Sequence, residues 1–188
     1  METTTEETVP PELAAVQALV NTIDLEDNDD RLDSPEALRR FLADQGLLDP
    51  SEPVGEADLA MAVELREALR AMLRVNHGEA LDPAALEVVN RAAAGLPLRV
   101  AFDAEGHPVL GPGSAGCRGA LAALLAGVAE ASAHGTWERL KACSAESCQW
   151  AFYDRSKNRS GRWCSMQTCG NRTKTRTYRT RRRSGPEG

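Results

Sequence analysis

The sequence predicts a mainly α-helical N-terminal domain with one small β-hairpin, followed by a compact C-terminal module that four cysteines organise. Three observations carry this prediction. Apolar residues recur at helical spacing through most of residues 10–135, strand-like alternation replaces this period near residue 100, and two C-x4-C pairs follow within residues 143–169. With 188 residues, of which 42% are hydrophobic, the chain can bury such a core without disulfides.

Two helices are predicted near the N-terminus, after residues 1–9, whose acidic and non-periodic sequence predicts a disordered tail. The first begins at Pro10 and ends at Asn21, which is either its C-terminal cap or a functional polar group at the helix end. The second begins at Ser34, with a proline in its first turn, and ends at Gly46. The acidic loop between them lacks the central glycine and distal glutamate of a calcium-binding loop, so we expect no calcium there.

The longest amphipathic pattern spans residues 57–75 and predicts a core helix, with Glu64, Glu67, Arg70 and Arg74 beside its apolar face. Another helix is expected between the capping residue Asp82 and a glycine at position 95.

A β-hairpin is predicted where residues 98–102 alternate and residues 107–110 return after a glycine turn. Residues 111–116 then spell G-x-G-x-x-G, but no strand–helix–strand unit follows, so we expect Ser114 to cap a helix over 115–134 and not a dinucleotide site. Small residues in that helix predict close packing. The three histidines lie in unrelated contexts and no catalytic set has useful spacing, so no enzyme is predicted.

The cysteine pairs are Cys143 with Cys148 and Cys164 with Cys169. Residues 149–153 predict a strand and 162–164 its return, so that a hairpin brings the second pair beside the first. Four thiolates in this arrangement suit one structural Zn²⁺ with no open coordination position. Cys117 lies outside the set, and we expect it to be a small buried apolar side chain.

The net charge of −6 hides a strong polarisation of the chain. Residues 1–140 hold 10 Lys/Arg and 25 Asp/Glu, a balance of −15, whereas residues 141–188 hold 12 and 3, a balance of +9. Cations gather in the turn between the cysteine pairs and after the last cysteine, which is typical of a polyanion-binding surface. The predicted nucleic-acid-binding residues are Arg155, Lys157, Arg159, Arg162, Arg172, Lys174, Arg176, Arg179, Arg181, Arg182 and Arg183.

Three residues after the last ligand have specific expected roles. Gly170 allows a tight turn, and Asn171 either caps a basic helix that begins there or bonds to a ligand loop. Arg172 either screens the thiolates or contacts phosphate. No apolar run approaches 18 residues and the N-terminus is acidic, so we expect a cytoplasmic protein, nucleoid-associated when bound, with no membrane partner.

Several of these stretches resemble known modules. Residues 150–154, 162–166 and above all Cys169-Gly170-Asn171-Arg172 resemble the CGNR zinc finger, a bacterial C-terminal module, over residues 137–183. Residues 19–22, the acidic alanine-rich helices and the hairpin near residue 100 resemble the ABATE domain that precedes this finger. The resemblance implies zinc ligands at the four cysteines, DNA binding by the surrounding cations, and a stress-induced transcription regulator.

We therefore predict an ABATE-like domain over 10–135, a treble-clef-like four-cysteine finger made of a β-hairpin and a basic helix over 136–184, and a tail over 185–188. The predicted function is zinc-dependent regulation of transcription through double-stranded DNA, with an N-terminal domain that senses an effector, forms a homodimer, or does both. One alternative is RNA binding, in which Trp150, Tyr153, Trp163 and Tyr178 stack on bases. The other is a protein-interaction adaptor whose basic finger docks on an acidic surface, including that of its own chain.

Overall fold

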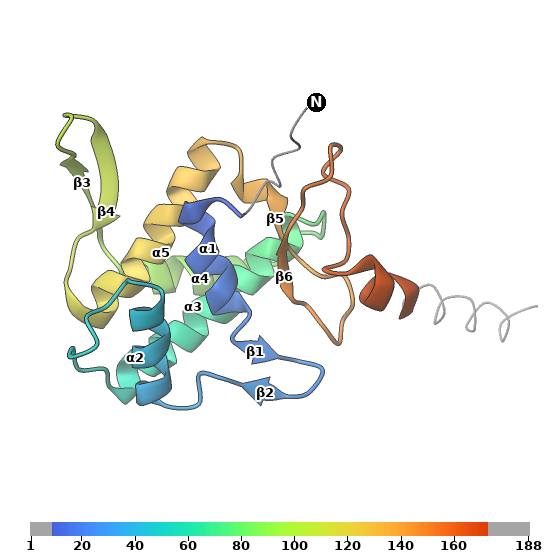
Figure 1. The fold of residues 1–188 in the computed structure, drawn as a ribbon, viewed down its shortest axis with the longest axis horizontal. Helices are drawn as coiled ribbons and strands as arrows, with labels where there is room; N and C mark the ends of the chain where they lie inside the picture. Colours follow the sequence, from blue (N-terminus) through green and yellow to red (C-terminus); the bar gives the residue numbers. More distant parts are fainter. Residues whose placement is uncertain (1–8, 173–188) are drawn as a thin grey trace, which may run out of the picture.

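The computed structural model describes residues 9–172, which form a helical body with three small antiparallel sheets (Figure 1). The predicted fold class is confirmed. In order along the chain, the elements are α1 (Pro11–Val20), β1 (Ile23–Asp24), β2 (Asp29–Asp30), α2 (Pro35–Asp44), α3 (Glu56–Val75), α4 (Pro83–Ala94), β3 (Leu98–Phe102), β4 (Pro108–Pro112), α5 (Gly116–Ala133), a 3-10 turn η1 (Trp137–Arg139), β5 (Leu140–Ala142), β6 (Ala151–Tyr153) and a π-helical turn η2 (Met166–Gly170).

Local signals set the starts of most helices where the sequence predicts them. The Ser34 hydroxyl accepts a hydrogen bond from the Ala37 N–H at 3.2 Å, and the Asp82 carboxylate accepts one from the Ala84 N–H at 3.0 Å. Each side chain satisfies an N–H group that the first helical turn leaves open. The expected cap at Ser114 is wrong, because α5 begins one residue later and the Ser114 hydroxyl is buried with no hydrogen-bond partner in the described part of the chain.

The core lies where α1, α3 and α5 meet. Leu19 of α1, Leu69 of α3 and Leu121 of α5 are buried in it. A Cβ atom at Gly127 would lie 2.3 Å from the Glu12 carbonyl oxygen, so only glycine lets the backbones of α5 and α1 approach this closely. This confirms the close packing predicted for the alanine-rich helix. Among residues 9–172, no helix is long and apolar enough to cross a membrane.

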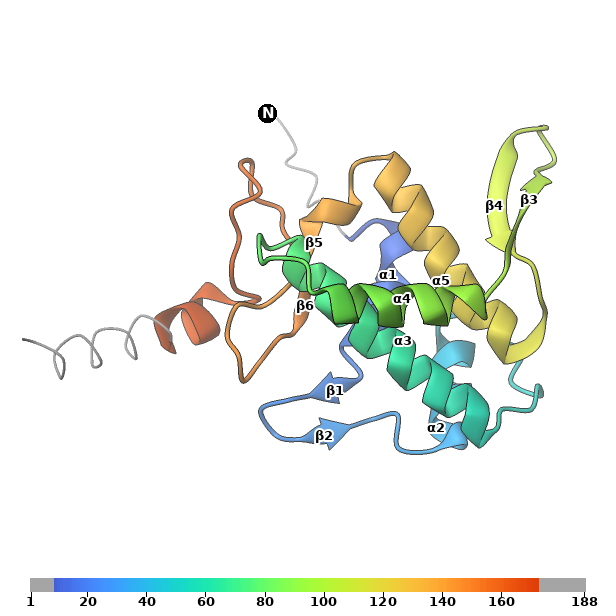
Figure 2. The same cartoon turned by 180° about the vertical axis from the view of Figure 1, so that it is seen from behind.

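The β3–β4 hairpin stands away from the helical body, at the opposite end of the molecule from η2 (Figures 1 and 2). Its register pairs Val100 with Leu110 and Phe102 with Pro108, so these apolar residues share one face. Val100 is 66% exposed and Phe102 71% exposed. The outer part of this face therefore contacts solvent.

The C-terminal module is built into the same core as the helices. Leu140 and Ala142 of β5 and Ala151 of β6 are buried among the core residues of α1 and α3. The predicted strand over 149–153 forms, but its partner is β5 and not residues 162–164, which form no strand. The 140–142 segment lies against the core and pairs with β6, so the first cysteine pair falls in the β5–β6 turn.

Candidate metal centre and its surroundings

Two structural elements deliver the four cysteines to one place. Cys143 and Cys148 lie in the β5–β6 turn, where the Cys143 N–H donates to the Trp150 carbonyl at 2.9 Å and the Cys148 N–H donates to the Ala145 carbonyl at 2.8 Å. Cys164 precedes η2 and Cys169 lies within it. All four Sγ atoms lie within 4.8 Å of one another. The arrangement combines a hairpin turn with the start of a helix, as expected for a treble-clef-like module.

The spacing of the sulfur atoms fits zinc. The Cys148 and Cys164 Sγ atoms are 3.7 Å apart, and those of Cys164 and Cys169 are 3.8 Å apart. A tetrahedral Zn²⁺ with bonds of about 2.3 Å requires sulfur–sulfur distances of about 3.8 Å. The four thiolates would hold one structural zinc ion and leave it no position for a substrate.

The pKa values of the four thiols also indicate a metal site. A hydrogen bond from the Cys148 thiol lowers the pKa of Cys143 to about 5, and donation of that bond, with burial, raises the pKa of Cys148. Burial and the charge on Cys143 raise the pKa of Cys164 to about 12. Without a cation, one thiolate therefore opposes ionisation of its neighbours, whereas a divalent ion stabilises all four.

The turn around Cys169 differs in two details from the prediction and agrees with it in a third. Ser165, not Asn171, caps η2, since the Ser165 hydroxyl accepts from the Thr168 N–H at 3.2 Å. Asn171 instead donates its side-chain N–H to the Gln167 carbonyl at 3.1 Å, which is the predicted alternative of a bond to a ligand loop. Gly170 lies inside η2, and a Cβ atom there would lie 2.5 Å from the Met166 sulfur, so a larger residue would require the exposed Met166 side chain to shift.

A buried ion pair shapes the loop between the cysteine pairs. The Lys141 Nζ donates to an Asp154 carboxylate oxygen at 2.7 Å, and both residues are buried. Asp154 also accepts from the N–H groups of Ser156 at 3.0 Å and Gly161 at 2.8 Å. Burial alone would raise the pKa of Asp154, but these hydrogen bonds outweigh it and lower the pKa to about 2. Asp154 is thus ionised and ties both ends of the basic loop together.

Five of the predicted nucleic-acid-binding residues are described, and all five are exposed: Arg155, Lys157, Arg159, Arg162 and Arg172. The structure places the first four on the loop after β6 and Arg172 just after η2, which contains the last ligand. The other six lie outside the described residues: Lys174, Arg176, Arg179, Arg181, Arg182 and Arg183.

Two of these cations lie near acidic groups, one in the N-terminal domain and one at the start of the finger. Arg172 forms an ion pair of 2.5 Å with Glu26, in the loop between β1 and β2. Arg159 lies 3.9 Å from Glu138 of η1. The Arg172–Glu26 pair brings together oppositely charged groups that lie 146 residues apart in the chain.

A polar junction that the sequence did not predict joins α1 to the finger. Asn21 follows the end of α1, and its buried side chain bonds to both backbone groups of Ala151 in β6. The Asn21 Nδ2 donates to the Ala151 carbonyl at 2.9 Å, and the Ala151 N–H donates to the Asn21 Oδ1 at 2.7 Å. Gln17 adds a third bond to the same carbonyl at 3.2 Å. Asn21 therefore ends the helix and also holds the finger's central strand.

Two further side chains, one on α3 and one on the residue that follows it, complete this junction. Arg70 donates to the Val20 carbonyl at 2.7 Å and to the Gln149 carbonyl at 3.0 Å. Its placement beside the apolar face was predicted, yet the residue is only 3% exposed, because the finger covers that edge of α3. Asn76 donates to the carbonyls of Trp137 and Leu140 at 2.9 and 3.0 Å. In the sequence, this junction was indicated only by the polar residues beside the apolar face of the longest helix.

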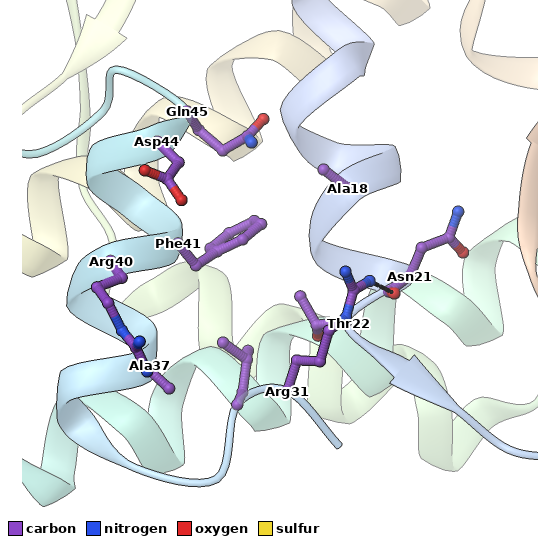
Figure 3. A pocket seen from close by; sticks show the side chains of 10 residues that line it. Ala18, Asn21, Thr22, Arg31, Ala37, Arg40, Phe41, Asp44 and Gln45 are labelled. Atoms are coloured by element: carbon purple, nitrogen blue, oxygen red, sulfur yellow. Dashed lines mark hydrogen bonds between the residues drawn. The ribbon is translucent and has the colours of Figure 1, made fainter. Parts of the chain in front are cut away.

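A pocket of about 370 Å³ opens between α1 and α2 (Figure 3). The Phe41 ring points into it, and Gln45 and Asp44 line one side. Arg31 lines the other side and donates a hydrogen bond to the main-chain carbonyl of Asn21. The pocket wall thus includes the residue that bonds to β6.

This combination of a helical domain and a basic four-cysteine module defines a zinc-finger protein of two joined parts. Residues 139–182 match the family model of the CGNR zinc finger. Residues 13–135 match the ABATE model, whose description is "Putative stress-induced transcription regulator", and since this covers more than half of the chain, the protein belongs to the ABATE family. Both resemblances are confirmed. No curated protein matches the chain.

Proposed function

We propose that this protein regulates transcription in the cytoplasm by binding double-stranded DNA, and that zinc holds its basic finger in shape. One observation supports this most directly: the five described cations of the finger are all exposed and surround a metal centre that can only be structural. The family description supplies the link to transcription. Nucleoid association follows from DNA binding.

The salt dependence of binding tests this proposal. If about six to eight cations meet phosphates, the logarithm of the affinity for duplex DNA falls with the logarithm of salt concentration with a slope of about −5 to −7. Replacing both Arg155 and Lys157 with alanine should make the slope shallower by about 2. The matched control is Arg118→Ala, an exposed cation on α5. A flat salt response of the unmodified protein would contradict phosphate binding.

RNA binding is the alternative, and direct competition separates it. Duplex DNA and single-stranded RNA of equal length compete for the protein at one salt concentration. Stronger competition by the RNA would favour recognition of unpaired bases.

We propose that the N-terminal domain senses a small organic acid in the α1–α2 pocket. The pocket volume is within the range of small-molecule sites, and its walls combine the Phe41 ring with the Arg31 guanidinium. Within residues 9–172, no carboxylate pairs with Arg31, which leaves the guanidinium charge to a ligand. A thermal-shift titration with aromatic carboxylates, with Arg31→Gln as the control, tests this assignment.

We also propose that the protein forms a homodimer through the β3–β4 hairpin. The exposed apolar face of Val100, Phe102 and Leu110 supports this, because a contiguous apolar patch on the surface is typical of an interaction site. The hairpin lies far from η2, so pairing would leave both fingers free (Figure 1). Sedimentation should show a dimer for the unmodified protein and a monomer for Phe102→Ser.

A further inference from the structure

The β1–β2 hairpin is strongly acidic. Ile23 pairs with Asp30 and Asp24 with Asp29, and the turn between the two strands adds two more acidic residues. We call residues 23–30 the acidic hairpin. Its turn points to the side of the molecule that carries η2 (Figures 1 and 2). Five of the seven residues from 24 to 30 carry a carboxylate: Asp24, Glu26, Asp27, Asp29 and Asp30.

Two of the five carboxylates have partners within the N-terminal domain. The Asp24 carboxylate accepts hydrogen bonds from the N–H groups of Glu26 and Asp27, at 2.9 and 3.3 Å, and so shapes the turn. The Asp30 carboxylate accepts from both Nη atoms of Arg66, at 2.7 and 2.9 Å, and Arg66 is buried in α3. The Asp30–Arg66 pair therefore fixes the acidic hairpin to α3 without any contribution from the finger.

The other three acidic residues of the hairpin, Glu26, Asp27 and Asp29, are exposed. Within residues 9–172, Glu26 pairs with Arg172, whereas the carboxylates of Asp27 and Asp29 form no ion pair or hydrogen bond. Neighbouring like charges repel one another, and a cation beside them lowers that repulsion. The acidic hairpin thus carries two carboxylates that the described cations do not pair.

Arg172 is the first residue of a basic segment, residues 172–183, which contains no acidic residue. The Arg172 Nη1 lies 2.5 Å from the Glu26 Oε1. A fully extended chain advances at most about 3.6 Å per residue, so the Lys174 Cα lies within about 7 Å of the Arg172 Cα in any conformation. The Arg172–Glu26 pair therefore brings the start of the basic segment to the acidic hairpin. The six further cations of the segment lie outside the described residues: Lys174, Arg176, Arg179, Arg181, Arg182 and Arg183.

We propose that the acidic hairpin is the docking surface for the basic segment of its own chain, and that the hairpin and DNA compete for the same cations. Charge complementarity supports this occupant, and covalent attachment keeps the segment at a high effective concentration beside the hairpin. The contact consists of exposed ion pairs, so docking weakens as ionic strength rises. Docking itself does not depend on the proposed function. The competition with DNA rests on that function and adds its regulation.

Two variants with the same change in net charge test the proposal. The hairpin variant neutralises the three exposed carboxylates of the acidic hairpin and keeps the size of each side chain: Glu26→Gln, Asp27→Asn and Asp29→Asn. The control variant neutralises three exposed carboxylates at the start of α3, on α4 and in the β3–β4 turn: Glu56→Gln, Glu87→Gln and Glu105→Gln. A zinc content of one ion per chain verifies that each variant retains the finger.

Limited trypsin digestion of the full-length, zinc-loaded proteins measures docking without DNA. Trypsin cleaves after Lys and Arg only where the chain is accessible, so docking slows cleavage within residues 173–183, which mass spectrometry of the released peptides reports. At low salt the hairpin variant should be cleaved there about three- to tenfold faster than the unmodified and control proteins. At about 1 M salt, where the Debye length is about 3 Å, all three should be cleaved at the same rate. At low salt the hairpin variant should also bind duplex DNA about five- to tenfold more tightly than the control variant.

The outcomes separate docking from DNA binding. Equal cleavage of the three proteins at low salt would overturn the docking, whatever their DNA affinities are. Protection that rises with protein concentration would also overturn it, because the occupant would then be the basic segment of a second copy. Faster cleavage of the hairpin variant with the same DNA affinity as the control variant would refute the competition. If the hairpin variant is cleaved faster but none of the three proteins binds duplex DNA, docking stands and the proposed function fails.

Discussion

Replacing Asn21 with alanine should destabilise the whole described body, although the residue touches neither the zinc ligands nor a predicted DNA contact. The substitution removes two hydrogen bonds to Ala151, of 2.9 and 2.7 Å. The Ala151 carbonyl keeps its bond from Gln17, but the Ala151 N–H is left buried without a partner. The change therefore affects the strand that joins the finger to the helices.

The expected loss in the free energy of unfolding is about 2–4 kcal/mol. A net contribution of about 1 kcal/mol per intramolecular hydrogen bond accounts for the lower part, and desolvation of the orphaned N–H, about 1–3 kcal/mol, accounts for the rest. The backbone conformation adds little to this loss in the free energy of unfolding, because Asn21 has φ −87° and ψ 13°, which alanine also adopts. Since domains of this size have a total stability of about 5–15 kcal/mol, the effect is large.

Urea unfolding of the zinc-loaded protein, followed by far-ultraviolet circular dichroism, measures this loss. The matched control is Asn90→Ala, because Asn90 is exposed on α4. We expect the control to change stability by less than about 0.5 kcal/mol. A loss for Asn21→Ala no larger than that of the control would refute the reasoning, because it would mean that the junction with β6 does not hold in solution.

Two further predictions concern the finger. Cys164→Ser should reduce bound zinc from about one ion per chain towards none. It should also lower the unfolding midpoint of the helices, because β5 and β6 belong to the helical core. Retained zinc, measured by elemental analysis, would show that the ligand set is wrong. Glu26→Gln should raise the affinity for duplex DNA about two- to fivefold at low salt, since it frees Arg172 from a solvent-exposed ion pair of modest strength. Fluorescence anisotropy measures this effect, and an equal gain for Glu105→Gln, at an exposed position on the β3–β4 hairpin, would contradict it.

Much of the helical framework and the whole ligand set could be predicted from sequence because their signals are local. A proline after a capping side chain marks the starts of α2 and α4, and the hydrogen bonds of Ser34 and Asp82 confirm both. The spacing of the cysteines predicted the metal ligands in the same way. The wrong prediction at Ser114 shows that a suitable side chain does not by itself fix the first residue of a helix. Because α5 begins one position later, Ser114 does not cap it.

The junction could not be predicted because its partners lie far apart in the chain. Asn21 and Ala151 are separated by 130 residues, and Arg70 and Gln149 by 79. A periodic pattern places Arg70 at the polar edge of its helix but does not show that another segment covers that edge. The pairing of β6 with β5 was missed for the same reason, since alternation identifies a strand without identifying its partner.

Asn21 links the α1–α2 pocket, where we propose that a ligand binds, to the finger, which we propose binds DNA. Its carbonyl accepts from Arg31 in the wall of the α1–α2 pocket, and its side chain bonds to β6, whose turn with β5 holds two zinc ligands. A ligand that draws Arg31 away from that carbonyl changes the bonding of the residue that positions the finger. Such a ligand alters DNA affinity only if its own affinity differs between the free and DNA-bound protein, with coupling of about 1–3 kcal/mol in typical cases. Because coupling is reciprocal, DNA must then change the affinity for the ligand by the same factor.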